Sequence, residues 1–278
     1  MTRAAEWLGF GKTVARLTYE SDIRYLATAV AYYAFVSFVP LLLIVVAVVG
    51  WRLAGDISAR QADVVTPDAQ QLLSEALATA SGRTGAVMLS IVVLAWGGVN
   101  VATGFLTAFE RLEAVTNRPL SLQLRDATVV LGSLSLAVLV VLFGTVLLAV
   151  FPGGILAILV GAVVLLAVLT VTFLPLYYVP SRVAESLSAA LPGALTAACG
   201  WTLIYAGIQF YVVNAAQYAI YGVLSGIIII LTSIYLAAVV LMVGVVVNVV
   251  LAADTDDPTA ATAFHATDGE SGSLERGK

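Results

Sequence analysis

Two long stretches without any charged residue constrain the fold of this chain more than any other feature. No Asp, Glu, Lys or Arg lies between Asp126 and Arg182, and none lies between Glu185 and Asp254. Both stretches are continuous blocks of Val, Leu, Ile and Ala, without the alternating pattern of about 10 residues that barrel strands require. Because an α-helix satisfies its own backbone hydrogen bonds in lipid, this pattern predicts an all-α, polytopic transmembrane helix bundle.

The overall composition supports the same class. Of 278 residues, 61% are hydrophobic and 11% are charged, whereas a soluble domain carries about 25% charged residues. The first apolar run follows four basic residues and resembles a signal peptide, but it is too long and lacks a small-residue cleavage site. We therefore expect a retained signal-anchor.

Six spans follow from the rule that about 20 apolar residues cross the hydrocarbon core. The sequence Phe151-Pro152-Gly153-Gly154 divides one apolar stretch that is too long for a single crossing, and Asn214-Ala215-Ala216-Gln217 divides the last two spans. The spans are expected near residues 26–50, 86–108, 127–150, 154–179, 189–213 and 223–251.

The distribution of Arg and Lys predicts the orientation, because cytoplasmic segments retain positive charge. Eight such residues lie in the N-terminal segment, in 109–126 and in 180–188, whereas the other side carries only Arg52, Arg60 and Arg83. This difference predicts that both ends lie in the cytoplasm, in the inner (cytoplasmic) membrane of the cell.

Three segments lie outside the predicted spans. Residues 1–25 are expected to form an amphipathic helix on the cytoplasmic surface, with a frayed terminus as the alternative; its apolar positions are Trp7, Phe10, Val14 and Leu17. A short external helix is expected within residues 51–85, where Thr66-Pro67-Asp68 is typical of a helix start. Residues 252–278 are acidic, lack a periodic apolar face and are expected to be disordered.

The sequence provides few reagents for catalysis. Its single histidine, His265, lies in the acidic tail, which leaves no catalytic triad and no histidine metal site in the folded part. We therefore expect no enzyme activity, no cofactor and no metal. We also expect no nucleic-acid partner, since the sequence pI is near 4.9. The acidic Glu110, Glu113 and Asp126 are expected to pair with neighbouring arginines on a solvated loop, and Cys199 to be a small packing residue.

Several uncharged polar residues lie within the predicted spans. They could line a pathway or could simply form hydrogen bonds between helices, and they are Tyr32, Tyr33, Ser37, Asn100, Thr103, Gln209 and Asn248. Of these, Tyr33, Asn100 and Asn248 are expected to face the bundle interior. Pro40 and Pro175 are candidate kinks, because each removes a backbone donor from its helix. Close helix contacts are expected at small residues, namely Gly97, Gly98, Gly104, Gly222 and Gly226.

Four segments resemble the YihY/BrkB family of membrane proteins. They are Ala31-Tyr32-Tyr33-Ala34-Phe35-Val36-Ser37-Phe38-Val39-Pro40, Leu191-Pro192-Gly193-Ala194, Tyr221-Gly222-Val223-Leu224-Ser225-Gly226, and the set Tyr235, Gly244 and Asn248. The resemblance covers roughly residues 10–252 and implies a six-helix membrane protein of a family named for virulence factors or ribonucleases and suspected of transport. Val246 and Ser233 replace a glutamate and a tryptophan that are common in that family, so a role of that glutamate is not expected here.

Two functional hypotheses follow. The first is a transporter-like or efflux-like protein of unassigned substrate, since six spans with little extramembrane mass carry polar residues near prolines. The second is a non-transporting membrane scaffold that docks partners through its N-terminal helix and the 109–126 segment. A ribonuclease is the least favoured reading. The lipid bilayer is the expected partner, and a homo-oligomer is left open.

Overall fold

The computed structural model describes residues 2–53, 80–113, 119–150, 154–184, 186–214 and 222–256. Within these ranges the protein is all-α and has no strand, as predicted. Its seven described helices are α1 (Thr2–Glu20), α2 (Ile23–Leu53), α4 (Ala80–Leu112), α5 (Leu120–Val150), α6 (Ile155–Tyr178), α7 (Leu187–Val213) and α8 (Gly222–Asp256).

Six of these helices overlap the residue ranges in which spans were predicted. Five are long and apolar enough to cross a membrane over their described residues: Val87–Leu112, Leu120–Thr145, Leu156–Tyr178, Leu187–Val213 and Gly226–Ala253. The described part of α2 adds a shorter apolar stretch, Ile23–Phe38. The chain is therefore a membrane protein with several apolar helices.

Local sequence signals explain where several helices begin and end. Asp22 separates α1 from α2 with a φ of 54°, a left-handed conformation that Asp adopts more readily than most residues. Ser186 caps α7, because its Oγ accepts the N–H of Ala189 at 3.2 Å. At the other end of α7, the side-chain amide of Asn214 donates to the Phe210 carbonyl at 2.7 Å.

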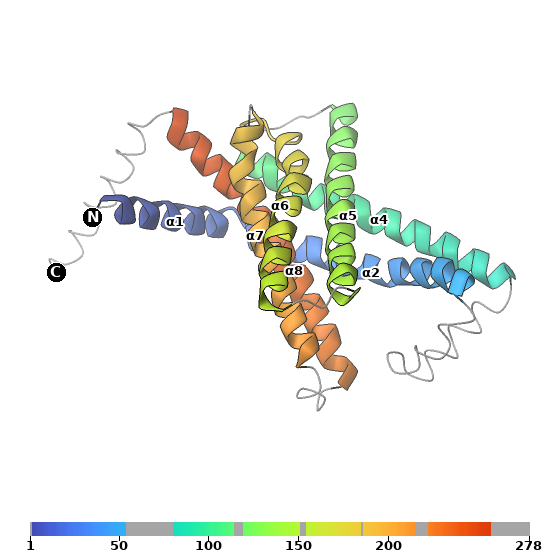
Figure 1. Ribbon diagram of the computed structural model, residues 1–278. Helices are drawn as coiled ribbons and strands as arrows, with labels where there is room; N and C mark the ends of the chain where they lie inside the picture. The colour runs from blue at the N-terminus through green and yellow to red at the C-terminus, as the bar shows by residue number, and fades with distance from the viewer. Residues whose placement is uncertain are drawn as a thin grey trace, which may run out of the picture.

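The helices form two groups that meet at α8. Figure 1 shows α2 and α4 side by side, crossing the group that contains α5, α6 and α7. Helix α8 contacts α1, α2, α4 and α7. Half of the residues in the most apolar part of α8 are buried, whereas only 17% are buried in the most apolar part of α5. Helix α8 is therefore the central helix of the described structure.

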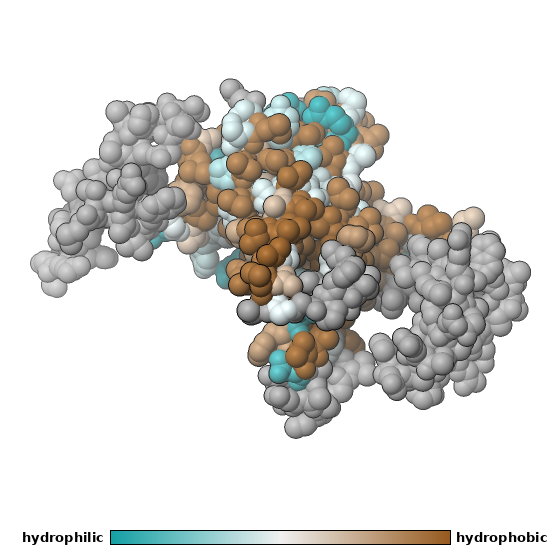
Figure 2. All heavy atoms as spheres, viewed as in Figure 1, coloured by the Kyte–Doolittle hydropathy of each residue, from teal (hydrophilic) through white to brown (hydrophobic). Residues whose placement is uncertain are grey.

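The outer surface of the helices is apolar. Large side chains such as Phe143, Val163 and Leu203 are each more than 60% exposed, and the surface in Figure 2 is brown over much of the described region. In water such a surface would be unstable, whereas in a bilayer it faces acyl chains. Cys199 is also exposed on α7, so its prediction as a packing residue was wrong.

The segments outside the predicted spans are described only in part. Helix α1 is present, and its Val14 and Leu17 pack against the protein core. Helix α8 continues to Asp256, beyond the predicted start of the acidic tail. The rest of that tail lies outside the described residues. So does the external helix predicted within 51–85, apart from residues 51–53, which belong to α2, and residues 80–85, which belong to α4.

Candidate functional site

The first candidate site is the α2–α4 seam, which we define as Tyr33, Ser37, Trp96, Gly97 and Asn100. Helix α2 approaches α4 so closely at Gly97 that a methyl group there would collide with Ser37 Oγ and would lie 3.2 Å from the Tyr33 carbonyl oxygen. Only a glycine permits this approach without rearrangement. Gly104 serves the same purpose farther along α4, where a methyl would lie 2.6 Å from Val30 Cγ2.

Three aromatic rings lie along this seam. The ring centroid of Tyr33 is 5.4 Å from that of Tyr32 and 5.2 Å from that of Trp96, with interplanar angles of 71° and 81°. Both arrangements are edge-to-face, which aromatic pairs favour. Tyr33 is half-buried between its neighbours, while Tyr32 and Trp96 are 57% and 51% exposed.

Ser37 has an unusual environment. Among the residues whose side chains the structure describes, its Oγ is the one buried side-chain oxygen or nitrogen without a hydrogen-bond partner. Pro40 lies inside the same helix and is buried, and it lacks the N–H that would bond to the Val36 carbonyl. Unsatisfied groups of this kind are costly in an apolar medium.

Asn100 lies one turn beyond Trp96 and three residues beyond Gly97, so it shares the side of α4 that meets α2. The side chain is half-buried, and its amide nitrogen donates to the Trp96 carbonyl at 2.7 Å. The structure thus brings Tyr33, Ser37 and Asn100 to one pair of helices.

The remaining predicted residues are dispersed. Thr103 is exposed on α4, Gln209 is half-buried on α7 and Pro175 is exposed on α6. Among the described residues, no hydrogen bond or ring contact joins their side chains to those of the α2–α4 seam. Whether Pro40 and Pro175 kink their helices stays a prediction.

The second polar cluster lies where α6, α7 and α8 meet. We call it the α6–α7–α8 seam and define it as Tyr177, Gly193, Gly244 and Asn248. Asn248 Oδ1 accepts the N–H of Gly193 at 2.6 Å, and its Nδ2 donates to the Ala190 carbonyl at 3.3 Å. Asn248 is buried, with 7% of its surface exposed. Both ends of its amide are satisfied, so this residue joins α7 to α8.

Tyr177 belongs to the same seam and was not singled out as a site residue. Its hydroxyl donates to the Leu241 carbonyl at 2.7 Å, deep in the protein. A methyl on Gly244 would lie 2.5 Å from Tyr177 Oη and 2.7 Å from the Gly193 carbonyl oxygen. A buried tyrosine needs a partner for its hydroxyl, but the sequence does not reveal that the partner is a carbonyl 64 residues away.

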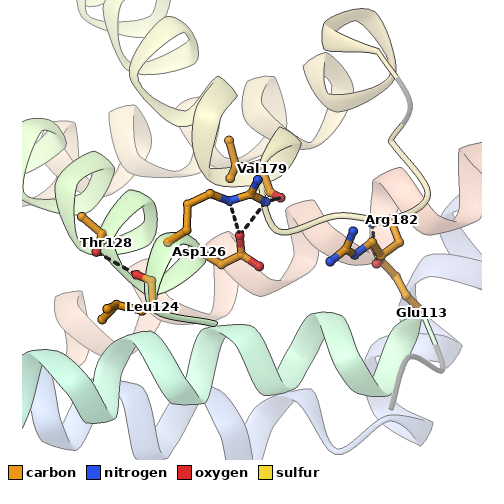
Figure 3. A network of polar contacts seen from close by, with 7 residues as sticks. Glu113, Leu124, Asp126, Thr128, Val179 and Arg182 are labelled. Carbon is orange, nitrogen blue, oxygen red and sulfur yellow. Dashed lines mark hydrogen bonds and ion pairs between the residues drawn. The ribbon is translucent and has the colours of Figure 1, made fainter. Parts of the chain in front are cut away.

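A third polar group, which we call the clasp, consists of Glu113, Arg125, Asp126, Ser181 and Arg182. Figure 3 shows Glu113, Asp126 and Arg182 of this group. Glu113 accepts the Ser181 hydroxyl at 2.6 Å and the Arg182 backbone N–H at 2.8 Å. Arg125 donates to Asp126 Oδ1 at 2.9 and 3.1 Å, and to the Val179 carbonyl at 3.3 Å. The clasp therefore links the end of α4, the start of α5 and the segment after α6.

The clasp confirms one part of the predicted role of the acidic residues, since Asp126 pairs with Arg125, and it corrects another part. Asp126 was expected on a solvated loop, but its side chain is completely buried and lies in α5, within an apolar membrane-length helix. Arg111 lies 4.0 Å from Asp22 rather than beside a neighbouring acid of its own segment. The prediction failed because α5 begins at Leu120, before the predicted start of the span.

A groove of about 540 Å³ lies between α7 and α8. Its lining is mainly apolar, with Thr232, Ser233 and Tyr211 among isoleucines and leucines, and Gly207 at its wall. None of the predicted site residues lines it. The groove is therefore a surface that acyl chains would fill and not a polar route.

Long apolar helices that place their polar side chains at helix–helix seams define a multi-pass membrane protein. The chain belongs to the virulence factor BrkB family, whose model matches residues 14–267, as the resemblance predicted. It is also similar to a putative ribonuclease-like protein, YfkH of Bacillus subtilis (strain 168), with 34% identity over 85 residues. That match covers 30% of this chain and 31% of the relative. No solved structure matches the chain.

Proposed function

We propose that the protein is a transporter-like or efflux-like protein of the inner membrane, with six spans and both ends in the cytoplasm. The α2–α4 seam forms part of its substrate route. The family match supports the membrane class, and the polar groups of this seam support the route.

The clasp supports the orientation. It gathers Arg125 and Arg182 at one end of the described helices, and Arg111 lies 4.0 Å from Asp22 in the turn before α2. The three segments that are expected in the cytoplasm from their basic residues thus contain residues that are paired with one another. Their positive charges favour retention on the cytoplasmic side.

The observation that carries the proposal is the contrast between Ser37 and Asn248. Asn248 is fully hydrogen-bonded and buried, as a structural residue in a bilayer should be. Ser37 lies within an apolar helix, and its buried hydroxyl has no partner. Such a group is stabilised when water or a polar ligand reaches it, which is the requirement of a transport route.

Cysteine accessibility tests the route. Cys199 is first replaced by Ala, because it is exposed. Ser37→Cys and Asn100→Cys are then treated with a small water-soluble methanethiosulfonate reagent in native membranes. Two control variants are treated in the same way. Val130→Cys replaces a residue of the buried core that is 0% exposed, and Val163→Cys replaces a surface residue of α6 that is 66% exposed.

The route requires faster modification of Ser37→Cys and Asn100→Cys than of either control. A lipid-facing thiol stays protonated and reacts slowly, whereas a thiol in a hydrated seam can ionise. If both seam variants react as slowly as Val163→Cys, the seam is dry and the scaffold hypothesis replaces the transporter.

The protein is not expected to cleave RNA, despite the name of its relative. The described residues contain no group of three or more His, Cys, Asp or Glu that could hold a metal, and Asp126 is buried against Arg125. The test is metal-dependent cleavage of a labelled tRNA precursor by purified protein. Cleavage that disappears in Glu110→Gln or Asp126→Asn would establish the enzyme instead.

A further inference from the structure

The α2–α4 seam combines exposed aromatic rings with neutral oxygen atoms. Tyr32, Tyr33 and Trp96 form a continuous edge-to-face row. Ser37 lies one helical turn beyond Tyr33, and Asn100 lies one turn beyond Trp96, so oxygen atoms lie next to the rings on both helices. The amide nitrogen of Asn100 already donates to the Trp96 carbonyl, which leaves its oxygen as the group offered to a ligand.

The charges of the two helices restrict what this site can bind. Neither residues 25–51 of α2 nor residues 84–109 of α4 contain Asp, Glu, Lys or Arg. An anion would therefore find no basic partner, and a small hydrated cation would find no carboxylate to replace its water. Aromatic faces attract a cation through the ring quadrupole, and this attraction is strongest where water is excluded.

Resting on the proposed function, we propose that the α2–α4 seam binds lipophilic organic cations, whose charge is spread over an apolar body. Tyr32 and Trp96 are more than half exposed, so such a cation can reach their rings from the bilayer, where it accumulates. The half-buried ring of Tyr33 lies next to both of these rings, and Ser37 and Asn100 lie one helical turn from the row.

Tetraphenylphosphonium and tetraphenylborate provide a matched pair of probes, because they have nearly the same shape and opposite charge. The reporter is full-length protein in detergent in which Trp7, Trp51 and Trp201 are replaced by Phe, so that fluorescence comes from Trp96. A second protein retains only Trp201, which packs against Phe173 elsewhere in the bundle. Quenching of both proteins to the same extent would indicate partitioning into the micelle and would overturn the proposal.

Saturable quenching of Trp96 by tetraphenylphosphonium, without saturable quenching by tetraphenylborate, is the expected result. Tyr33→Leu should weaken binding about 3- to 30-fold, whereas Tyr33→Phe, which keeps the ring, should change it by less than about 2-fold. Tetraphenylborate binding as tightly as the cation, or equal affinities of Tyr33→Leu and Tyr33→Phe, would overturn the assignment. If the thiol reagent modifies Ser37→Cys but no cation binds, the proposed route stands and the proposed ligand class is wrong. If the reagent does not modify Ser37→Cys and no cation binds, the proposed route and the proposed ligand class are both wrong.

Discussion

Asn248 on α8 and Gly193 on α7 are joined by a hydrogen bond of 2.6 Å, with the asparagine oxygen accepting the glycine N–H. The two residues are 55 positions apart in the chain. Their contact is so close that a methyl on Gly193 would lie 2.6 Å from Asn248 Nδ2. The glycine is therefore required for the asparagine to reach the backbone of the neighbouring helix.

Replacing Asn248 by Ala should destabilise the protein by about 1–2 kcal/mol. This exceeds the average of about 0.6 kcal/mol for side-chain hydrogen bonds in membrane proteins, because two bonds are lost and a buried backbone group loses its partner. Thermal unfolding in detergent measures the effect. Asn214→Ala is the control, since that exposed amide bonds only within its own helix; equal midpoints for the two variants would contradict the structural role of Asn248.

Replacing Gly244 by Ala should destabilise the protein by about 1–3 kcal/mol, the usual cost of overpacking. The added methyl would lie 2.5 Å from Tyr177 Oη and would push α6 away from α8. Gly132→Ala provides the matched control, because a methyl there meets nothing within 4 Å and improves helix propensity by up to about 1 kcal/mol. The two variants should thus shift the unfolding midpoint in opposite directions.

Removing the Glu113 carboxylate should loosen the segment after α6. Glu113→Ala deprives the Ser181 hydroxyl and the Arg182 N–H of their shared acceptor, so trypsin should cut after Arg182 several times faster in inside-out vesicles. Thr128→Ala serves as the control, since it loses only a bond to Leu124 within α5. Cleavage at the same rate in both variants would show that the clasp does not hold this segment.

The proposed orientation predicts opposite labelling of two engineered cysteines. In a Cys199→Ala background, an impermeant thiol reagent added to intact cells should modify a cysteine at Ala59 and spare one at Ser186, because positive charge keeps the 180–188 segment inside. Labelling at Ser186 but not at Ala59 would invert the topology.

The helices could be predicted from the sequence because lipid imposes one requirement on every span, namely internal backbone hydrogen bonds and an apolar exterior. Continuous apolar runs reveal that requirement directly. Helix α5 ends at Val150 and α6 begins at Ile155, on either side of the predicted break, and Ser186 begins α7 where the basic loop ends. The start of α5 was missed, because Asp126 and Arg125 looked like loop residues although they neutralise each other within a helix.

The site could be predicted only in its residue types. Polar residues inside spans are visible in the sequence, but the helix pair on which they meet is not. Ser37 and Asn100 lie on one pair of helices that pack closely because Gly97 lets α2 approach α4, whereas Gln209 lies on α7. Tyr177 was not singled out because its partner is a backbone carbonyl, and a carbonyl leaves no signal in the residue type of Leu241.

The central position of α8 has a consequence for biosynthesis. Ribosomes make α1 to α7 first, so α2, α4 and α7, which α8 will contact, must enter the bilayer before their shared neighbour exists. During that interval Gly193 and Tyr177 lack their partners Asn248 and Leu241, and the nascent helices are held by pairwise contacts alone. A ribosome that stalls before α8 therefore leaves an incomplete bundle with polar groups open to lipid, which membrane quality-control proteases can recognise.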